Sequence, residues 1–189
     1  SLCQTMSELG HDASIITFTV QYPKIFFPGK TQFSEDAEPK NIQIERKLSS
    51  VNPFSWFSTA KKINKERPDM VIIRYWIPLL SPSLGSIARL LNKDIITIAM
   101  CDNVIPHEKR IGDMALTKYF IRSFDGFITL SNTTIKELDQ FTNKEKTYFP
   151  HPINKNLGEK KDKKIARDYL NLDEEGKYLL FFGLIRDYK

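Results

Sequence analysis

The chain has 189 residues, enough for one domain with a sizeable core or for one domain and part of another. Its 41% hydrophobic and 12% aromatic residues, against 27% charged residues, describe a globular protein and exclude a disordered or fibrous one. The net charge of +5 suits an anionic partner. Lys and Arg are scattered, however, and no nucleic-acid-binding pattern occurs, so nucleic acid is not an expected partner.

The cysteine usage and hydropathy favour a cytoplasmic protein. Cys3 and Cys101 lie far apart, without the spacing of a disulfide framework or a zinc site. No stretch reaches the ~18 uninterrupted apolar residues that a membrane-spanning helix needs. We therefore expect a protein of the reducing cytoplasm, either free or attached peripherally to the inner face of the membrane.

The amino-terminal stretch has the pattern of half a βαβ unit. Leu2, Met6 and Leu9 are spaced as the apolar face of a helix that Gly10 can end. Residues 13–20 are β-branched and almost all apolar, as in a strand covered on both faces of a parallel sheet. The strand that should precede this helix is not in the sequence. The chain begins with Ser1, and its first residues do not resemble a signal peptide.

Helices and strands then alternate along the chain. A strand is expected at 41–48, after a proline-containing loop at 21–41. Helices are predicted at 56–66, 81–92, 112–124 and 133–141, and strands at 70–76, 94–101, 125–131 and 146–150. This alternation predicts an α/β fold with a Rossmann-like parallel sheet, helices on both faces and the first strand missing.

A polar, charged segment at 151–164 has the composition of an interdomain linker. Beyond it we predict a helix at 164–172 and a fully buried strand at 177–183. The sequence therefore predicts a first domain over 1–150, the linker, and a truncated second α/β domain over 165–189.

Candidate functional residues follow the predicted strands, because parallel α/β sheets bind ligands at the carboxyl ends of their strands. Arg74 lies at the end of one strand, and Asp102, Asn103, His107 and Glu108 follow the next. A His beside a carboxylate can act as a general base or bind a sugar hydroxyl, whereas the alternative is a solvated loop with a bystander His. Arg186 and Lys189 follow the last predicted strand.

The remaining histidines and aromatic residues give weaker evidence of a functional site. We interpret His11 as a turn residue, His151 as part of the linker, and the aromatic pair Tyr75 and Trp76 as packing residues rather than a sugar platform. The sequence contains no GxGxxG, GxxxxGK[ST] or GxSxG motif and no metal-ligand spacing. Dinucleotide, P-loop, hydrolase and metal-site interpretations therefore have no direct support.

The ordered motifs of the chain resemble those of bacterial glycosyltransferases with the GT-B fold, in the retaining family 4 group. The segments are GHDASIITF, RPDMVIIRYW, DNVIPHEKR, FDGFITLSNTTIKEL and FFGLIRDYK, and together they span almost the whole chain. The resemblance implies the N-terminal half of a GT-B fold. Residues 1–150 would form the acceptor-side domain without its Gly-rich loop, and residues 165–189 would begin the donor-side, nucleotide-sugar-binding domain.

The resemblance also implies roles for individual residues. Arg186 and Lys189 match the basic pair that binds the donor's diphosphate, and His107 matches a catalytic histidine of the cleft, best suited to positioning the acceptor. Asp102 stands where many relatives have another histidine, so that histidine's role does not transfer. Asp102, Asn103, Glu108 and Arg74 would line the acceptor side of the cleft.

The expected reaction is transfer of a sugar from a nucleotide diphosphate sugar to a glycan or lipid-linked acceptor, as in polysaccharide biosynthesis. No metal or other cofactor is expected. A GT-B nucleotide-sugar 2-epimerase and a non-catalytic sugar-binding module are the alternatives. The net charge and the phenylalanines of the 21–41 loop also suggest a membrane surface as a partner. Residues 1–189 alone should be inactive, because half of the cleft would be missing.

Overall fold

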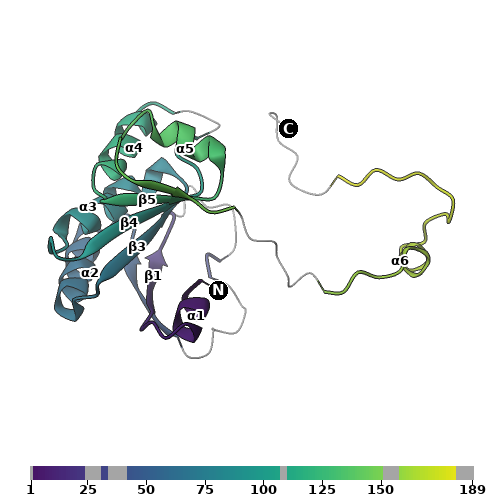
Figure 1. Ribbon diagram of the computed structural model, residues 1–189, viewed down its shortest axis with the longest axis horizontal. Coiled ribbons are helices and arrows are strands. Elements are labelled where there is room, and N and C mark those ends of the chain that lie inside the picture. The colour runs from purple at the N-terminus through teal and green to yellow at the C-terminus, as the bar shows by residue number, and fades with distance from the viewer. Residues whose placement is uncertain (1, 24–30, 34–41, 107–109, 151–157, 182–189) are drawn as a thin grey trace. The chain divides into compact units, whose positions relative to one another are not determined.

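The computed structural model describes residues 2–23, 31–33, 42–106, 110–150 and 158–181 (Figure 1). The chain divides into two compact units, Ser1–His151 and Pro152–Lys189. The first unit contains both sheets and nearly all of the helices.

The strands of the first unit form two parallel sheets. Strands β1 (Ser14–Val20) and β2 (Gln43–Ser49) pair with each other. The larger sheet has four strands in the order β3-β4-β5-β6, formed by Met70–Tyr75, Ile96–Cys101, Gly126–Thr129 and Lys146–Tyr148. Every pairing is parallel. The expected α/β class with a parallel sheet is therefore confirmed.

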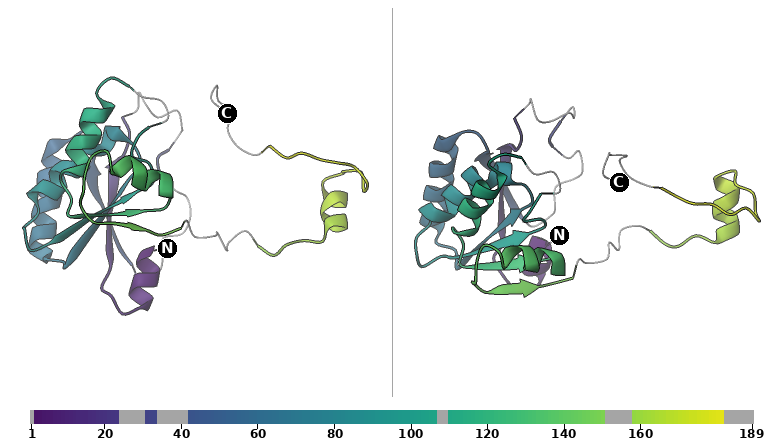
Figure 2. Two further views of the ribbon diagram at one scale, coloured as in Figure 1. Left: turned by 45° about the horizontal axis from the view of Figure 1, so that its top comes forward. Right: turned by 90° about the horizontal axis from the view of Figure 1, so that it is seen from above.

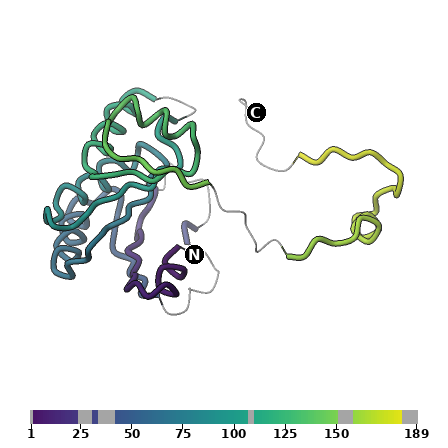
Figure 3. Tube along the Cα trace, in the orientation of Figure 1, coloured from purple at the N-terminus to yellow at the C-terminus, as the bar shows by residue number. Residues whose placement is uncertain are grey.

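Helices connect the consecutive strands from β2 to β6, as the crossovers between parallel strands commonly do. Figure 3 traces the chain across the larger sheet from β3 to β6 in sequence order, and Figures 1 and 2 show α1 and α2 on opposite sides of β1. The helices of this unit are α1 (Leu2–Glu8), α2 (Pro53–Glu66), α3 (Ser81–Leu90), α4 (Asp113–Ile121) and α5 (Asn132–Leu138), with a short 3-10 helix η2 (Pro78–Leu80) before α3.

Local sequence signals explain where α2 begins and ends. The side chain of Asn52 accepts a hydrogen bond from the backbone N–H of Phe54 at 3.1 Å, and Pro53 occupies the first turn, where no backbone N–H is needed. The helix ends at Arg67, which adopts a left-handed φ of 49° and donates its N–H to the carbonyl of Ile63. Pro68 follows and cannot continue the helix.

The core lies between the larger sheet and α3 and α4. Tyr75, Phe120 and Phe124 are fully buried and in ring contact: Tyr75 stacks on Phe120 with centroids 4.0 Å apart, and Phe120 meets Phe124 at 4.4 Å. The Tyr75 hydroxyl hydrogen-bonds the hydroxyls of Ser81 and Thr117, each at 3.2 Å. This arrangement joins the end of β3 to both helices.

The smaller sheet is attached to the same core through β2 and α2. Leu48 is buried in the core cluster, and Ile16 and Phe18 of β1 pack against it while remaining partly exposed. The indole N–H of Trp56 donates to the carbonyl of Ser49 at 2.7 Å. The two sheets therefore belong to one packed unit although their strands do not pair within the described residues.

The second unit contains one described helix, α6 (Lys163–Tyr169), capped by Asp162, whose carboxylate accepts from the backbone N–H groups of Lys164 and Ile165. The predicted buried strand at 177–183 is wrong over its described part, because residues 177–181 are neither a strand nor buried. Leu179 and Leu180 are 104% and 88% exposed. An apolar run forms a strand only when another strand satisfies its backbone, and no described strand does so here.

Candidate functional site

The candidate site is the edge of the larger sheet at which β3, β4 and β5 end together. Tyr75 is the register partner of Cys101, and Cys101 is the register partner of Thr129. The residues that follow these strands therefore emerge side by side, as the sequence analysis required of a ligand-binding edge.

Arg74 and Asp102 meet at this edge. The guanidinium of Arg74 donates from Nε to Oδ2 of Asp102 at 2.8 Å and from Nη2 to Oδ1 at 3.3 Å. The Arg74 side chain is 60% exposed and that of Asp102 21% exposed. The two-point contact fixes the plane of the guanidinium and leaves much of its surface open to a ligand. Two predicted site residues, 28 positions apart in sequence, are thus in direct contact.

The loop that begins with Asp102 is tied to α5. The Thr134 hydroxyl donates to the backbone carbonyl of Asp102 at 3.3 Å. The backbone N–H groups of Val104 and Ile105 both donate to Oε2 of Glu137, at 3.3 and 3.1 Å. Ser131 caps α5 by accepting from the backbone N–H of Thr134 at 3.1 Å. A carboxylate on one helix therefore holds a loop more than 30 residues away in sequence.

The role of Glu137 was missed by the sequence analysis. Its partners are backbone N–H groups, which leave no side-chain signature in the sequence, so only the fold could reveal the contact. Asn103, by contrast, was expected at the site and is exposed there, with no hydrogen bond to its side chain among the described residues. Its amide can therefore both donate to and accept from a ligand.

A second contact at the same edge joins the two sheets. Trp76, directly after β3, donates its indole N–H to the hydroxyl of Tyr22, just beyond β1, at 2.6 Å. Trp76 is partly buried and packs against the core, whereas Tyr75 is fully buried. The interpretation of this aromatic pair as packing residues is confirmed. Burial also raises the pKa of Tyr75, which excludes it as an acid or base near neutral pH.

Cys101 and Thr129 end their strands below this surface. Both are fully buried. Burial, and to a lesser degree the nearby Asp102 carboxylate, raises the pKa of the Cys101 thiol, so it is not a nucleophile. The Thr129 hydroxyl has no hydrogen-bond partner among the described residues.

Several predicted site residues lie outside the described residues. These are His107, Glu108, Arg186 and Lys189. Their assignments as acceptor-positioning, cleft-lining and diphosphate-binding residues stay predictions.

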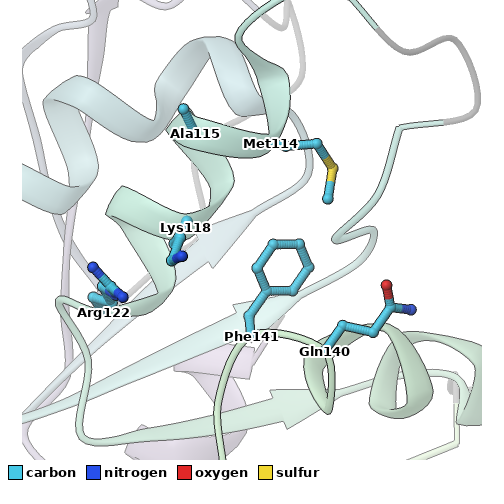
Figure 4. A pocket seen from close by; sticks show the side chains of 6 residues that line it. All are labelled: Met114, Ala115, Lys118, Arg122, Gln140 and Phe141. Carbon is cyan, nitrogen blue, oxygen red and sulfur yellow. The ribbon is translucent and has the colours of Figure 1, made fainter.

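A separate open hollow of about 440 Å³ lies along α4 (Figure 4). Figure 4 shows the Phe141 ring turned toward α4, with Gln140 beside it. The hollow contains none of the predicted site residues and is lined by Met114, Ala115, Lys118, Arg122, Gln140 and Phe141. Its cations could contact an anionic group, but nothing links it to the strand ends.

No three His, Cys, Asp or Glu residues of the described ranges gather closely enough to hold a metal ion. None of the helices in the described part of the chain is long and apolar enough to cross a membrane.

Comparison with known proteins identifies no family to which this chain belongs. No family model matches the chain, and no curated protein matches it.

Proposed function

We propose that this chain is the acceptor-side part of a retaining GT-B glycosyltransferase, which transfers a sugar from a nucleotide diphosphate sugar to a glycan or lipid-linked acceptor. The observation that supports this proposal best is the convergence of Arg74, Asp102 and Asn103 at the carboxyl edge of a parallel sheet. This edge is where α/β sheets bind their ligands.

The chemistry of the three side chains suits an acceptor rich in hydroxyl groups. Asp102 offers carboxylate oxygens that accept hydrogen bonds, Arg74 offers donors held in a fixed plane, and the exposed Asn103 amide offers both. A sugar hydroxyl is at once a donor and an acceptor, so it can satisfy such a set. His107, four positions after Asn103 in the sequence, would position the attacking hydroxyl.

The donor side of the proposal concerns Arg186 and Lys189. Breaking the anomeric C–O bond leaves growing negative charge on the departing diphosphate while the sugar becomes oxocarbenium-like. Fixed cations beside that oxygen stabilise the transition state more than the ground state. Arg supplies a planar two-point contact and Lys a mobile point charge, so the pair can perform this task without a divalent metal.

The test uses the complete protein with a panel of nucleotide diphosphate sugars and glycan or lipid-linked acceptors. The expected result is sugar transfer, with NMR of the product showing that the anomeric configuration is retained. Arg186→Ala and Lys189→Ala should each lower kcat by roughly 10²-fold, in line with the loss of one charge-stabilising donor. Lys160→Ala, at an exposed cation of the 151–164 segment that is not one of the proposed diphosphate-binding pair, is the matched control and should leave kcat unchanged.

The other outcomes separate the alternatives. Conversion of the donor to its 2-epimer in the absence of acceptor would identify an epimerase instead. Sugar binding without any turnover would identify a binding module. His107→Ala should mainly raise the KM for the acceptor; an unchanged acceptor KM would remove its positioning role.

A further inference from the structure

We infer that Glu137 is a positioning residue for the ligand site, and that it acts by fixing the backbone of Asn103 so that the exposed Asn103 amide is held ready for a ligand. The fixing of Asn103 concerns the first unit alone. The further statement that the ligand is the sugar acceptor rests on the proposed function.

Asp102 is held to the larger sheet and to α5 by contacts that do not involve Glu137. Its backbone N–H donates to the carbonyl of Tyr75 at 2.9 Å, and its carbonyl accepts from the Thr134 hydroxyl at 3.3 Å. Its carboxylate makes the two-point contact with Arg74. Contacts of its backbone and of its side chain therefore fix Asp102 independently of Glu137.

The backbone N–H groups that follow Asn103 depend on Glu137. Its Oε2 accepts from the N–H of Val104 at 3.3 Å and from the N–H of Ile105 at 3.1 Å. Val104 is 1% exposed, and Ile105 is partly buried against the core. Leaving such backbone groups without an acceptor costs free energy. Without the Glu137 carboxylate, this segment would have to move until both N–H groups reach water.

The position of Glu137 in its helix also points to this role. Glu137 is the last residue but one of α5 (Asn132–Leu138), which follows β5 directly (Figure 1). The carbonyl end of a helix disfavours a negative charge. Within the described residues Glu137 makes no ion pair that would offset this. The two backbone N–H groups of the loop are the donors that stabilise its carboxylate.

Asn103 therefore combines a fixed backbone with a free side chain. The residues on both sides of it are hydrogen-bonded through their backbones, whereas its own amide is exposed and has no hydrogen bond within the described residues. An amide that is already in position loses little conformational entropy when a ligand binds. Glu137 should thus strengthen ligand binding without touching the ligand.

The separate supports predict which part of the site Glu137 controls. Asp102 keeps its contacts when Glu137 is removed, so Arg74 should stay in place. Asn103 loses the support on its carboxyl side. Loss of Glu137 should therefore weaken the ligand contact of Asn103 and leave the pair of Arg74 and Asp102 unchanged. A residue that only stabilised the fold would affect both.

The first experiment tests the fixing of the loop in the 189-residue chain. Amide hydrogen exchange at Val104 and Ile105 is followed by NMR in Glu137→Ala. The Nε–H signal of Arg74 reports whether the rest of the site is intact. Lys136→Ala is the matched control, because it removes a neighbouring exposed charge of α5.

Exchange at the two amides should accelerate at least about tenfold in Glu137→Ala, and by less in Glu137→Gln, which keeps a neutral acceptor oxygen. The Arg74 signal should be unchanged in both variants, and Lys136→Ala should match the parent chain. Unchanged exchange in Glu137→Ala would overturn the inference. Loss of the Arg74 signal together with the faster exchange would also overturn it, by showing that Glu137 supports the whole site.

The second experiment uses the complete protein with the nucleotide diphosphate sugar and the acceptor on which the parent enzyme is active. Asn103→Ala and Glu137→Ala should each raise the KM for the acceptor by about fivefold to tenfold, as for one lost hydrogen bond, and leave the KM for the donor unchanged. The double variant should be no worse than Asn103→Ala, because Glu137 acts through Asn103. Effects that multiply in the double variant would contradict this.

The two experiments separate the inference from the proposed function. If the complete protein transfers no sugar, the proposed function fails, and hydrogen exchange still decides whether Glu137 fixes the segment after Asn103. If transfer occurs and Glu137→Ala leaves the acceptor KM unchanged, the positioning role is refuted and the proposed function stands.

Discussion

Removing the hydroxyl of Tyr75 should destabilise the first unit without changing its fold. Tyr75→Phe deletes two hydrogen bonds of 3.2 Å, to Ser81 and Thr117, while the ring keeps its stack on Phe120. A neutral hydrogen bond contributes about 1 kcal/mol net, and the two hydroxyls left behind are fully buried. The Thr117 hydroxyl can turn toward the carbonyl of Asp113, one turn earlier in α4, which limits the penalty. We therefore expect a loss of about 2 kcal/mol in the free energy of unfolding.

The assay for Tyr75→Phe is urea unfolding followed by far-UV circular dichroism. In thermal unfolding of a unit of this size, the same loss of about 2 kcal/mol corresponds to a fall of roughly 4–8 °C in Tm. Tyr119→Phe is the matched control, because its hydroxyl makes one bond, to Ser86 at 2.8 Å, in a partly buried setting. It should cost about 1 kcal/mol or less. A Tyr75→Phe variant as stable as the parent chain would refute the reasoning.

Three further predictions concern stability and reactivity. Gly85→Ala should destabilise the protein by about 1–2 kcal/mol although Ala favours helices, because the added Cβ would lie 2.8 Å from Cε1 of Tyr119. In a Tyr119→Ala background, where this ring is absent, the same substitution should stabilise the protein. Chemical unfolding of the two pairs of variants checks both expectations. The backbone N–H of Thr97 holds the pKa of Asp125 below its usual 3.8, so this stability contribution is present above that pH and is lost as the pH falls through the lower folded value. Between about pH 6 and about pH 3 the parent chain should therefore lose more stability than Asp125→Asn, and equal losses in urea unfolding would contradict this. Cys101 should react with an aromatic disulfide only as fast as the protein unfolds, and rapid labelling of this thiol in the native protein would contradict its burial.

Much of the first unit's architecture could be predicted from local patterns. The alternation of β-branched runs with amphipathic segments identified the described α-helices and strands of this unit and the parallel pairing of the strands, but not the 3-10 helix η2. Boundaries differed by a few residues. The helix expected over 112–124 begins at Asp113, after the left-handed Gly112, and ends at Ile121. The strand expected over 94–101 begins only at Ile96, where pairing with β3 starts.

The run at 177–181 could not be judged from its own residues. Its apolar composition is that of a buried strand, yet Leu179 and Leu180 are exposed. Composition reports what a segment can bury, whereas strand formation depends on a partner that supplies hydrogen bonds.

The features of the candidate site also divide into those that the sequence predicted and those that only the structure shows. The positions of Arg74, Asp102 and Asn103 at strand ends followed from the sequence pattern, because parallel strands end at a common edge. The two-point contact between Arg74 and Asp102 and the binding of the 104–105 backbone by Glu137 required the tertiary structure. In the first unit, sequence by itself determined which segments form α-helices and strands, since that choice depends there on periodicity within a few residues. Only the tertiary structure decided which side chains meet, since those contacts join residues about 30 positions apart through the packing of strands and helices.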